Sequence, residues 1–190
     1  MNSAGQLILA SGSPRRRDLL AEAGYDFRVV PPSDAAEDAG RVGETAAELV
    51  ARLARQKAAD VAQRLTSGLV LGCDTVVECT GQILGKPRDA AHASDMLSLL
   101  SGQEQYVYSG LCLWPLPEGL PRVEVERTTL RMRRLSAAEI GDYLASGLWL
   151  GKAGGFGYQD RLGWLEIVEG SESNIVGLPL ERLAAMLRDR

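Results

Sequence analysis

Histidine, cysteine and long apolar runs are scarce in this 190-residue sequence, and each scarcity argues against a class of protein. His92 is its one histidine, so a Ser-His-Asp or Cys-His mechanism would depend on that side chain alone. The G-x-S-x-G turn that carries many nucleophilic serines does not occur either. We therefore do not expect nucleophilic covalent catalysis, and we expect His92 to face solvent.

The cysteines and the apolar segments indicate where the protein works. Cys73, Cys79 and Cys112 are odd in number and far apart, without a CxxC pair or the spacing of a zinc site. They are typical of free thiols in a reducing compartment. No apolar segment approaches the ~20 residues of a membrane span, and residues 1–10 lack the cationic start of a secretion signal. We expect a cytoplasmic protein with no membrane partner.

Charge and length narrow the options further. Acidic residues outnumber basic residues by 25 to 21, which gives a net charge of −4, so the overall field repels a nucleic-acid backbone. A nucleic-acid polymer is therefore not an expected partner. With 45% hydrophobic residues, the chain is long enough to bury a substantial core, and we expect residues 1–190 to form a single domain.

Capping signals and apolar patterns predict alternating strands and helices. Ser13 and Pro14 start a helix, and capping boxes open two more at Thr45 and Ser136. Residues 69–71 and 75–77 bracket residues 72–74 and predict a buried strand that runs into a hairpin with residues 82–84. The other predicted strands are residues 7–10, 106–114, 122–135 and 164–168, and the remaining helices begin near 90 and 180. This alternation favours a mixed α/β sheet. Within 122–135 the apolar positions change from odd to even numbers, which predicts a β-bulge.

A basic segment follows the first predicted strand. Residues 11–17 place small residues and three arginines where that strand meets a helix N-terminus. Free backbone N–H groups, the positive helix end and arginine side chains together favour phosphate oxygens. A solvated basic first turn is an equally good interpretation of this segment alone, although arginine in a first turn opposes the helix dipole.

Three further charged residues have functional interpretations. Asp74 follows an apolar strand and a glycine, so we expect its carboxylate at a strand end beside a cleft, where it can bind a divalent metal or accept a proton from water. Carboxylates with purely structural roles also occupy such positions. Lys57 on an apolar helix face and Lys86 could neutralise phosphate charge, although a single lysine more often extends to solvent.

The segment 151–157 contains too many glycines for a helix or strand interior, so its backbone is expected to approach another group closely. Its spacing does not match a Walker A or a dinucleotide-binding sequence. Gln159 carries a donor and an acceptor and could read the imide edge of a pyrimidine base. A surface glutamine would have the same appearance in the sequence.

Several segments, taken in order, resemble the Maf family of septum-formation-inhibitor-like nucleotide pyrophosphatases. The resemblance rests on residues 9–16, 72–77, 84–87, 100–102, 152–159 and 177–180. It implies a two-lobed α/β fold with an elongated mixed sheet, flanking helices and a deep central cleft, similar to inosine triphosphatase. It also implies hydrolysis of a nucleoside triphosphate to the monophosphate and pyrophosphate, with a divalent cation (Mg or Mn), in a homodimer.

The resemblance also assigns roles to residues of this chain. Asp74 corresponds to the proton acceptor that activates water and is also a metal ligand. The phosphate-binding group comprises Ser13, Arg15, Arg16, Lys57 and Lys86. Arg15, Thr75 and Gln159 match positions tied to base choice in the branch that acts on dTTP and UTP, and residues 152–154 are unlike the branch that acts on 7-methyl-GTP.

Two departures from the family pattern affect these assignments. An Asp-Glu pair usually follows the first strand and helix, whereas residues 31–38 here lack that pair. We place the metal-side carboxylate at Glu37, with Asp34 as the alternative. Asp160 replaces a common glycine and is expected to add negative charge beside the base pocket.

Two other functions remain open at this point. One is a non-catalytic regulator of cell division that binds nucleotide or a protein partner without turnover. The other keeps the chemistry but changes the substrate to a modified purine nucleotide such as 7-methyl-GTP. Asp74, Lys57 and Lys86 occurring together favour the enzyme, because a pure binder gains little from a carboxylate that activates water.

Overall fold

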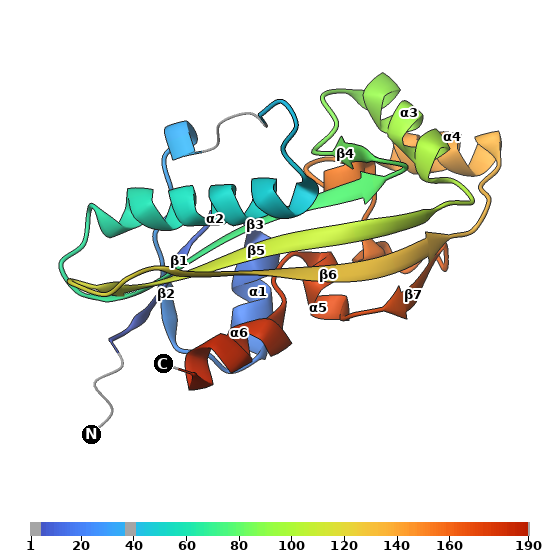
Figure 1. The fold of residues 1–190 in the computed structure, drawn as a ribbon. Helices are drawn as coiled ribbons and strands as arrows, with labels where there is room; N and C mark the ends of the chain where they lie inside the picture. Colours follow the sequence, from blue (N-terminus) through green and yellow to red (C-terminus); the bar gives the residue numbers. More distant parts are fainter. Residues whose placement is uncertain (1–4, 37–40, 190) are drawn as a thin grey trace.

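A computed structural model describes residues 5–36 and 41–189 and contains one seven-stranded sheet with helices on both sides (Figure 1). The strand order is β2-β1-β3-β5-β6-β7, and β4 pairs with β3 off this path. The strands are β1 Leu7–Ala10, β2 Phe27–Val29, β3 Gly68–Cys79, β4 Gln82–Leu84, β5 Glu104–Leu116, β6 Arg122–Met132 and β7 Leu165–Glu169. The helices are α1 Pro14–Glu22, α2 Ala46–Ala62, α3 Ala90–Leu100, α4 Ala137–Ser146, α5 Glu172–Val176 and α6 Leu180–Arg188.

The sheet is mixed. β1 runs parallel to β2 and β3, whereas β3, β5, β6 and β7 pair antiparallel in that order. Short 3₁₀ turns occur at Asp34–Ala36, Ala153–Gly155 and Tyr158–Asp160. The predicted class, an elongated mixed sheet flanked by helices, is confirmed. No helix in the described ranges is long and apolar enough to cross a membrane.

Three of the predicted helix starts are confirmed by capping hydrogen bonds. Thr45 and Ser136 each form a capping box with the glutamate three residues later. Asp89 accepts a hydrogen bond from the backbone of His92 and so caps α3. At the other end of α4, Gly147 adopts a left-handed conformation with φ of 72°, which a glycine takes without steric cost.

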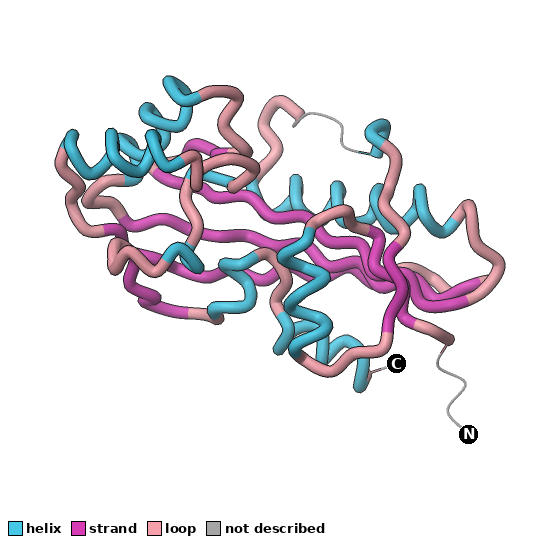
Figure 2. The backbone as a smooth tube through the Cα atoms, turned by 180° about the vertical axis from the view of Figure 1, so that it is seen from behind, coloured by secondary structure: helices cyan, strands magenta, loops and turns pink. Residues whose placement is uncertain are grey.

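Different helices cover the two faces of the sheet, as Figure 2 shows from behind. Val70 and Cys112 pack with α2, whereas Leu71 and Leu111 pack with α1 and α6 on the opposite face. This follows from the strand period of two, which sends neighbouring side chains to opposite faces. The three cysteines are buried free thiols, as predicted.

Helix α2 lies directly on the backbone of the central strands. A Cβ atom added at Gly72 would lie 2.1 Å from the carbonyl oxygen of Ala54, and one added at Gly110 would lie 2.1 Å from that of Val50. Glycine is therefore required at both crossings. Because the helix approaches so closely, side chains on its lower face reach the strands without an intervening layer.

The change of apolar phase in β6 has a different cause from the predicted bulge. β6 pairs with β5 in unbroken register over ten residue pairs. Val123 and Val125 pack on the face covered by α2, whereas Leu130 and Met132 belong to the cluster built around α3. The phase changes because the buried face of the strand changes. A register irregularity does occur between Thr129 and Leu130, but in the pairing with β7.

An opening in the sheet lies beside the middle of β3. The pairing of β1 with β3 ends at Gly72, and the pairing of β4 with β3 begins at Val77. Within the described strands, none pairs with residues 73–76 on that edge. The prediction that Asp74 sits at a strand end was therefore wrong, because it lies inside the 12-residue strand β3. The strand that ends there is its neighbour β1.

Candidate active site

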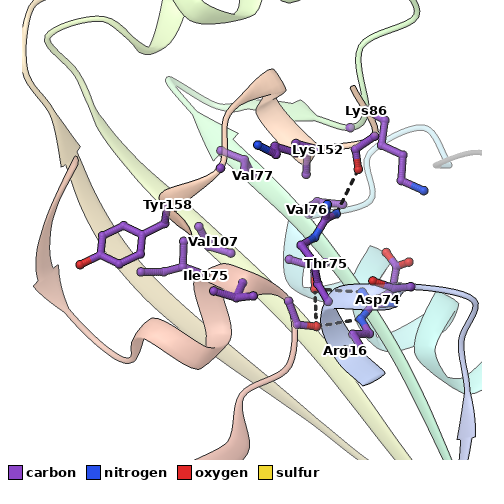
Figure 3. A pocket seen from close by; sticks show the side chains of 18 of the residues that line it. Arg16, Asp74, Thr75, Val76, Val77, Lys86, Val107, Lys152, Tyr158 and Ile175 are labelled. Carbon is purple, nitrogen blue, oxygen red and sulfur yellow. Dashed lines mark hydrogen bonds between the residues drawn. The ribbon is translucent and has the colours of Figure 1, made fainter. Parts of the chain in front are cut away.

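A cavity of about 640 Å³ occupies this opening (Figure 3). The loop before α1, the middle of β3, the segment after β4 and the glycine-rich loop all contribute to its walls. It contains every predicted catalytic and substrate-binding residue, namely Ser13, Arg15, Arg16, Lys57, Asp74, Thr75, Lys86 and Gln159. Residues that are far apart in the sequence therefore converge on one cavity, and the predicted deep cleft is confirmed.

Asp74 and Lys57 form an ion pair in the wall of this cavity. Lys57 Nζ lies 2.6 Å from Asp74 Oδ1, and the two side chains are 5% and 13% exposed. The close approach of α2 to β3 places the lysine there. Within the described part of the chain, Asp74 Oδ2 accepts no hydrogen bond, so this oxygen is available to a ligand or to water. A carboxylate fixed at one oxygen and open at the other is suited to accept a proton.

Arg16 joins three segments of the wall. Its Nε donates to the Gly177 carbonyl oxygen at 2.8 Å, its Nη1 to Ser11 Oγ at 3.2 Å and its Nη2 to Thr75 Oγ1 at 3.1 Å. The Thr75 hydroxyl also hydrogen-bonds Ser109 Oγ at 2.8 Å. Arg16 therefore holds the loop before α1 against β3 and the turn before α6, in addition to lining the cavity.

The other predicted phosphate-binding residues differ in burial. Arg15 is half-buried and donates from Nη2 to the Gly151 carbonyl oxygen at 3.0 Å. Burial, followed by the like charge of Arg16, lowers the pKa of Arg15, so a nearby anion would offset both effects. Ser13 occupies the N-cap position of α1, but its side chain makes no capping hydrogen bond. Lys86 is exposed at the cavity edge.

Asp160 is neutralised, which corrects the expectation that it adds negative charge beside the pocket. Lys152 Nζ lies 2.5 Å from Asp160 Oδ1 and 2.6 Å from Oδ2, and Tyr143 donates its hydroxyl to Oδ2 at 2.7 Å. Burial and this hydrogen bond to Asp160 raise the pKa of Tyr143. These three residues fix the glycine-rich loop to α4. Gln159 stays exposed at the rim.

The glycine-rich loop does approach its surroundings closely, as its composition predicts. The backbone N–H of Gly154 donates to the Gly85 carbonyl oxygen at 3.0 Å, which joins the loop to the segment carrying Lys86. A Cβ atom added at Gly157 would lie 2.8 Å from Lys152 Nζ. The loop therefore forms one wall of the cavity and leaves room for the buried lysine.

The predicted metal ligands are only partly within the described residues. Glu37 lies outside them, and Asp34 is exposed in the turn Asp34–Ala36. The described ranges contain no cluster of three or more His, Cys, Asp or Glu side chains that could hold a metal alone. Asp74 is the one described carboxylate of the cavity lining. Because Mg²⁺ commonly takes one or two carboxylates together with substrate phosphates and water, this donor set fits such an ion.

Sequence reasoning missed three residues of this region. Tyr143 and Lys152 were not connected to Asp160, since no local pattern brings α4 against the glycine-rich loop. Gln105 was overlooked although it lines the cavity and is 3% exposed. The period of two along β5 offered a signal, because Gln105 lies two residues before the buried Val107 and therefore on the same face of the strand. His92 is half-buried and outside the cavity lining.

The mixed sheet, the cationic cavity and the Lys-Asp pair define an α/β protein whose cleft suits a phosphorylated small molecule. A family model described as Maf-like protein matches residues 6–190. The chain therefore belongs to the Maf-like protein family, in agreement with the resemblance in its sequence.

Named relatives are similar over most of the chain. A dTTP/UTP pyrophosphatase of Rhodopirellula baltica is 53% identical over 184 residues, which cover 96% of this chain and 81% of the relative. A dTTP/UTP pyrophosphatase of Ruminiclostridium cellulolyticum is 41% identical, covering 95% of this chain and 94% of the relative. Among solved structures, a HAM1 protein from Coxiella burnetii overlaps 97% of this chain and 99% of its own, with 16% identity and a TM-score of 0.48.

Proposed function

We propose that this protein hydrolyses dTTP or UTP to the nucleoside monophosphate and pyrophosphate. The observation that carries the proposal is Asp74, held by Lys57 at one oxygen and open at the other, in a cavity lined by arginine and lysine. The names of the relatives, dTTP/UTP pyrophosphatases at 53% and 41% identity, support the choice of substrate.

Asp74 acts as the proton acceptor in this mechanism. Its open oxygen takes a proton from water as the water oxygen attacks the α-phosphorus. The bond between that phosphorus and the oxygen bridging to the β-phosphate breaks, and its electron pair leaves with pyrophosphate. Lys57 fixes the carboxylate through Oδ1 at 2.6 Å, so the acceptor does not have to reorganise during the reaction.

The cationic residues bind and orient the triphosphate. Arg15 and Lys86 supply positive charge around the cavity, and Arg16 with Ser13 shapes the loop before α1. Cleavage of a phosphoanhydride depends mainly on positioning and on stabilising negative charge, which these groups provide. When bound, a divalent cation (Mg or Mn) would neutralise further phosphate charge. Asp74 and Glu37 would hold it, with Asp34 as the alternative to Glu37.

The remaining property of the site is its choice of base. Gln159 at the rim and Thr75 in the wall are proposed to contribute to recognition of the pyrimidine, together with Arg15. The single sheet supports a single domain over residues 1–190. A homodimer and a cytoplasmic location remain predictions from the family resemblance and the sequence.

The test is pyrophosphate release from a panel of canonical and modified nucleoside triphosphates, with and without magnesium or manganese. Metal-dependent turnover of dTTP or UTP supports the proposal. Turnover confined to another base, such as 7-methyl-GTP, keeps the chemistry and removes the substrate assignment. Saturable nucleotide binding without turnover of any member of the panel would favour the non-catalytic regulator.

A further inference from the structure

One polar side chain in the cavity wall has no part in the proposed hydrolysis. Gln105, on β5, is 3% exposed and lines the cavity with Val107 and Leu130. Gln105 and Val107 point to the same face of the strand, and Leu130 is paired with Gln105 across to β6. Gln105 therefore belongs to an apolar part of the wall, apart from the lysines and arginines.

The amide nitrogen of Gln105 has no hydrogen-bond partner among the described residues. Among the described residues, two buried side-chain polar atoms make no hydrogen bond, Gln105 Nε2 and Asn174 Oδ1. Asn174 does not line the cavity, and its Nδ2 donates to the Val107 carbonyl oxygen and to Thr128 Oγ1. A buried donor without an acceptor costs free energy. Nε2 itself is buried, so a bound ligand supplies the missing acceptor once the Gln105 amide turns toward the cavity that this residue lines.

The division of the cavity indicates which part of a ligand reaches Gln105. Figure 3 places Arg16, Asp74 and Lys86 toward one side and Val107, Tyr158 and Ile175 toward the other. A triphosphate requires the charged side, so the base of the nucleotide must lie against the apolar side. The faces of a pyrimidine ring are apolar, and its polar atoms lie on the ring edge. A single donor in the apolar wall can therefore recognise the base through a hydrogen bond to one of these edge atoms.

We infer that Gln105 is a specificity-determining residue whose Nε2–H donates to a carbonyl oxygen of the pyrimidine base. The inference rests on the proposed function and adds a base contact on the inner wall, whereas Gln159 is exposed at the rim. Uracil and thymine carry carbonyl oxygens at C2 and C4. Cytosine keeps the first and has an amino group at C4, which cannot accept this hydrogen bond. A donor directed at C4 therefore rejects cytosine.

The experiment compares wild type with Gln105→Leu, which has a similar size and no polar atoms. Gln103→Leu is the matched control, because Gln103 is exposed two residues earlier in the chain and does not line the cavity. Values of kcat/KM are measured for UTP, 2-thio-UTP, 4-thio-UTP and CTP. Sulfur accepts hydrogen bonds more weakly than oxygen, so the thio substitution at the contacted carbonyl weakens the contact. Urea unfolding is measured for all three proteins.

We expect Gln105→Leu to lower kcat/KM for UTP by about ten- to a hundredfold, while Gln103→Leu matches wild type. Wild type should discriminate against one thio analogue, and Gln105→Leu should lose that discrimination. The thio analogue that wild type discriminates against identifies the contacted carbonyl. If that carbonyl is at C4, the ratio of kcat/KM for CTP to kcat/KM for UTP should also be higher in Gln105→Leu than in wild type. The stability of Gln105→Leu should equal or exceed that of wild type, because the substitution removes an unsatisfied buried donor.

Three results would overturn the inference while leaving the proposed function in place. The first is unchanged kcat/KM for UTP in Gln105→Leu. The second is an unchanged response of this variant to both thio analogues. The third is reduced stability with unchanged discrimination, as expected if the amide has a structural partner such as buried water. If wild type turns over no nucleotide, the proposed function fails, and equilibrium binding of UTP and its thio analogues then tests Gln105 separately.

Discussion

One Lys-Asp pair lies in the cavity wall and a second lies behind the glycine-rich loop, where Lys152 alone lines the cavity, and the hydrogen bonds of the two pairs differ. Lys57 contacts Asp74 through Oδ1 alone, whereas Lys152 contacts both oxygens of Asp160 and Tyr143 donates to one of them. The first pair joins a long helix to a central strand, whereas the second closes a loop that Tyr143 ties to α4. The oxygen that remains open, and not the presence of a charge pair, separates a carboxylate suited to chemistry from one suited to structure.

The largest expected effect separates the two carboxylates by turnover. Asp74→Asn should lower kcat by about 10²- to 10⁴-fold, because the amide cannot accept the proton that the carboxylate takes from water. Steady-state pyrophosphate release from UTP measures the effect. Nucleotide binding by the variant checks that the cavity remains intact. Wild-type kcat in Asp74→Asn would remove the role assigned to this residue.

The second pair should show its effect in stability. Asp160→Asn leaves Lys152, whose side chain is 10% exposed, facing a neutral amide. Removal of one partner from a buried ion pair costs about 3–5 kcal/mol, so the free energy of unfolding in urea should fall by that order. Turnover at saturating UTP should be largely kept below the unfolding temperature. A stable variant with turnover as low as Asp74→Asn would reverse the assignment of the two pairs.

The position of Lys57 depends on the contact between α2 and β3. Gly72→Ala places a Cβ atom 2.1 Å from the Ala54 carbonyl oxygen, which must displace the helix that carries Lys57. We expect a stability loss of about 1–3 kcal/mol from overpacking, with reduced turnover. Gly141→Ala is the control, because a Cβ atom there meets nothing within 4 Å and α4 should gain up to about 1 kcal/mol. Equal stabilities of the two variants would contradict the proposed contact.

The smallest effect concerns the hydroxyl of Tyr143 and depends on pH. Its pKa is raised in the folded protein, by burial and by Asp160, so the unfolded chain loses its proton first. This contribution to stability is complete below the ordinary tyrosine value of about 10 and is lost as pH rises above it. Tyr143→Phe should cost about 1–2 kcal/mol at pH 7 through the lost hydrogen bond.

The pH dependence of the same variant provides a second readout. Between pH 9 and 11, unfolding in urea should show a shallower loss of stability for Tyr143→Phe than for wild type. Identical slopes for the two proteins would show that the hydroxyl is not held as described.

Local signals in the sequence were sufficient for most of the fold. Caps at Thr45, Asp89 and Ser136 define helix starts through contacts within four residues, and these predictions are confirmed. The strand position of Asp74 was wrong because the opening is created by the end of β1, a neighbour in space. The phase change in β6 was attributed to a bulge because a sequence does not reveal which helix covers which face of a sheet.

The predicted catalytic and substrate-binding residues converge, but their hydrogen bonds could not be predicted. Arg16 was expected only to bind phosphate, and the structure also shows it joining Ser11, Thr75 and Gly177. Asp160 was interpreted as an added negative charge because its partner Lys152 lies eight residues earlier, across a loop whose path no periodic pattern describes. Such contacts depend on loop geometry, which composition alone does not determine.

The most direct test of the role of Asp74 is single-turnover pyrophosphate release, with enzyme in excess over UTP and at saturation, for wild type, Asp74→Asn and Asp160→Asn. These conditions report the chemical step without product release. A slow step confined to Asp74→Asn, by about 10²-fold or more, is the predicted result. A chemical step in Asp74→Asn as fast as in wild type would contradict the assignment of Asp74 as the proton acceptor.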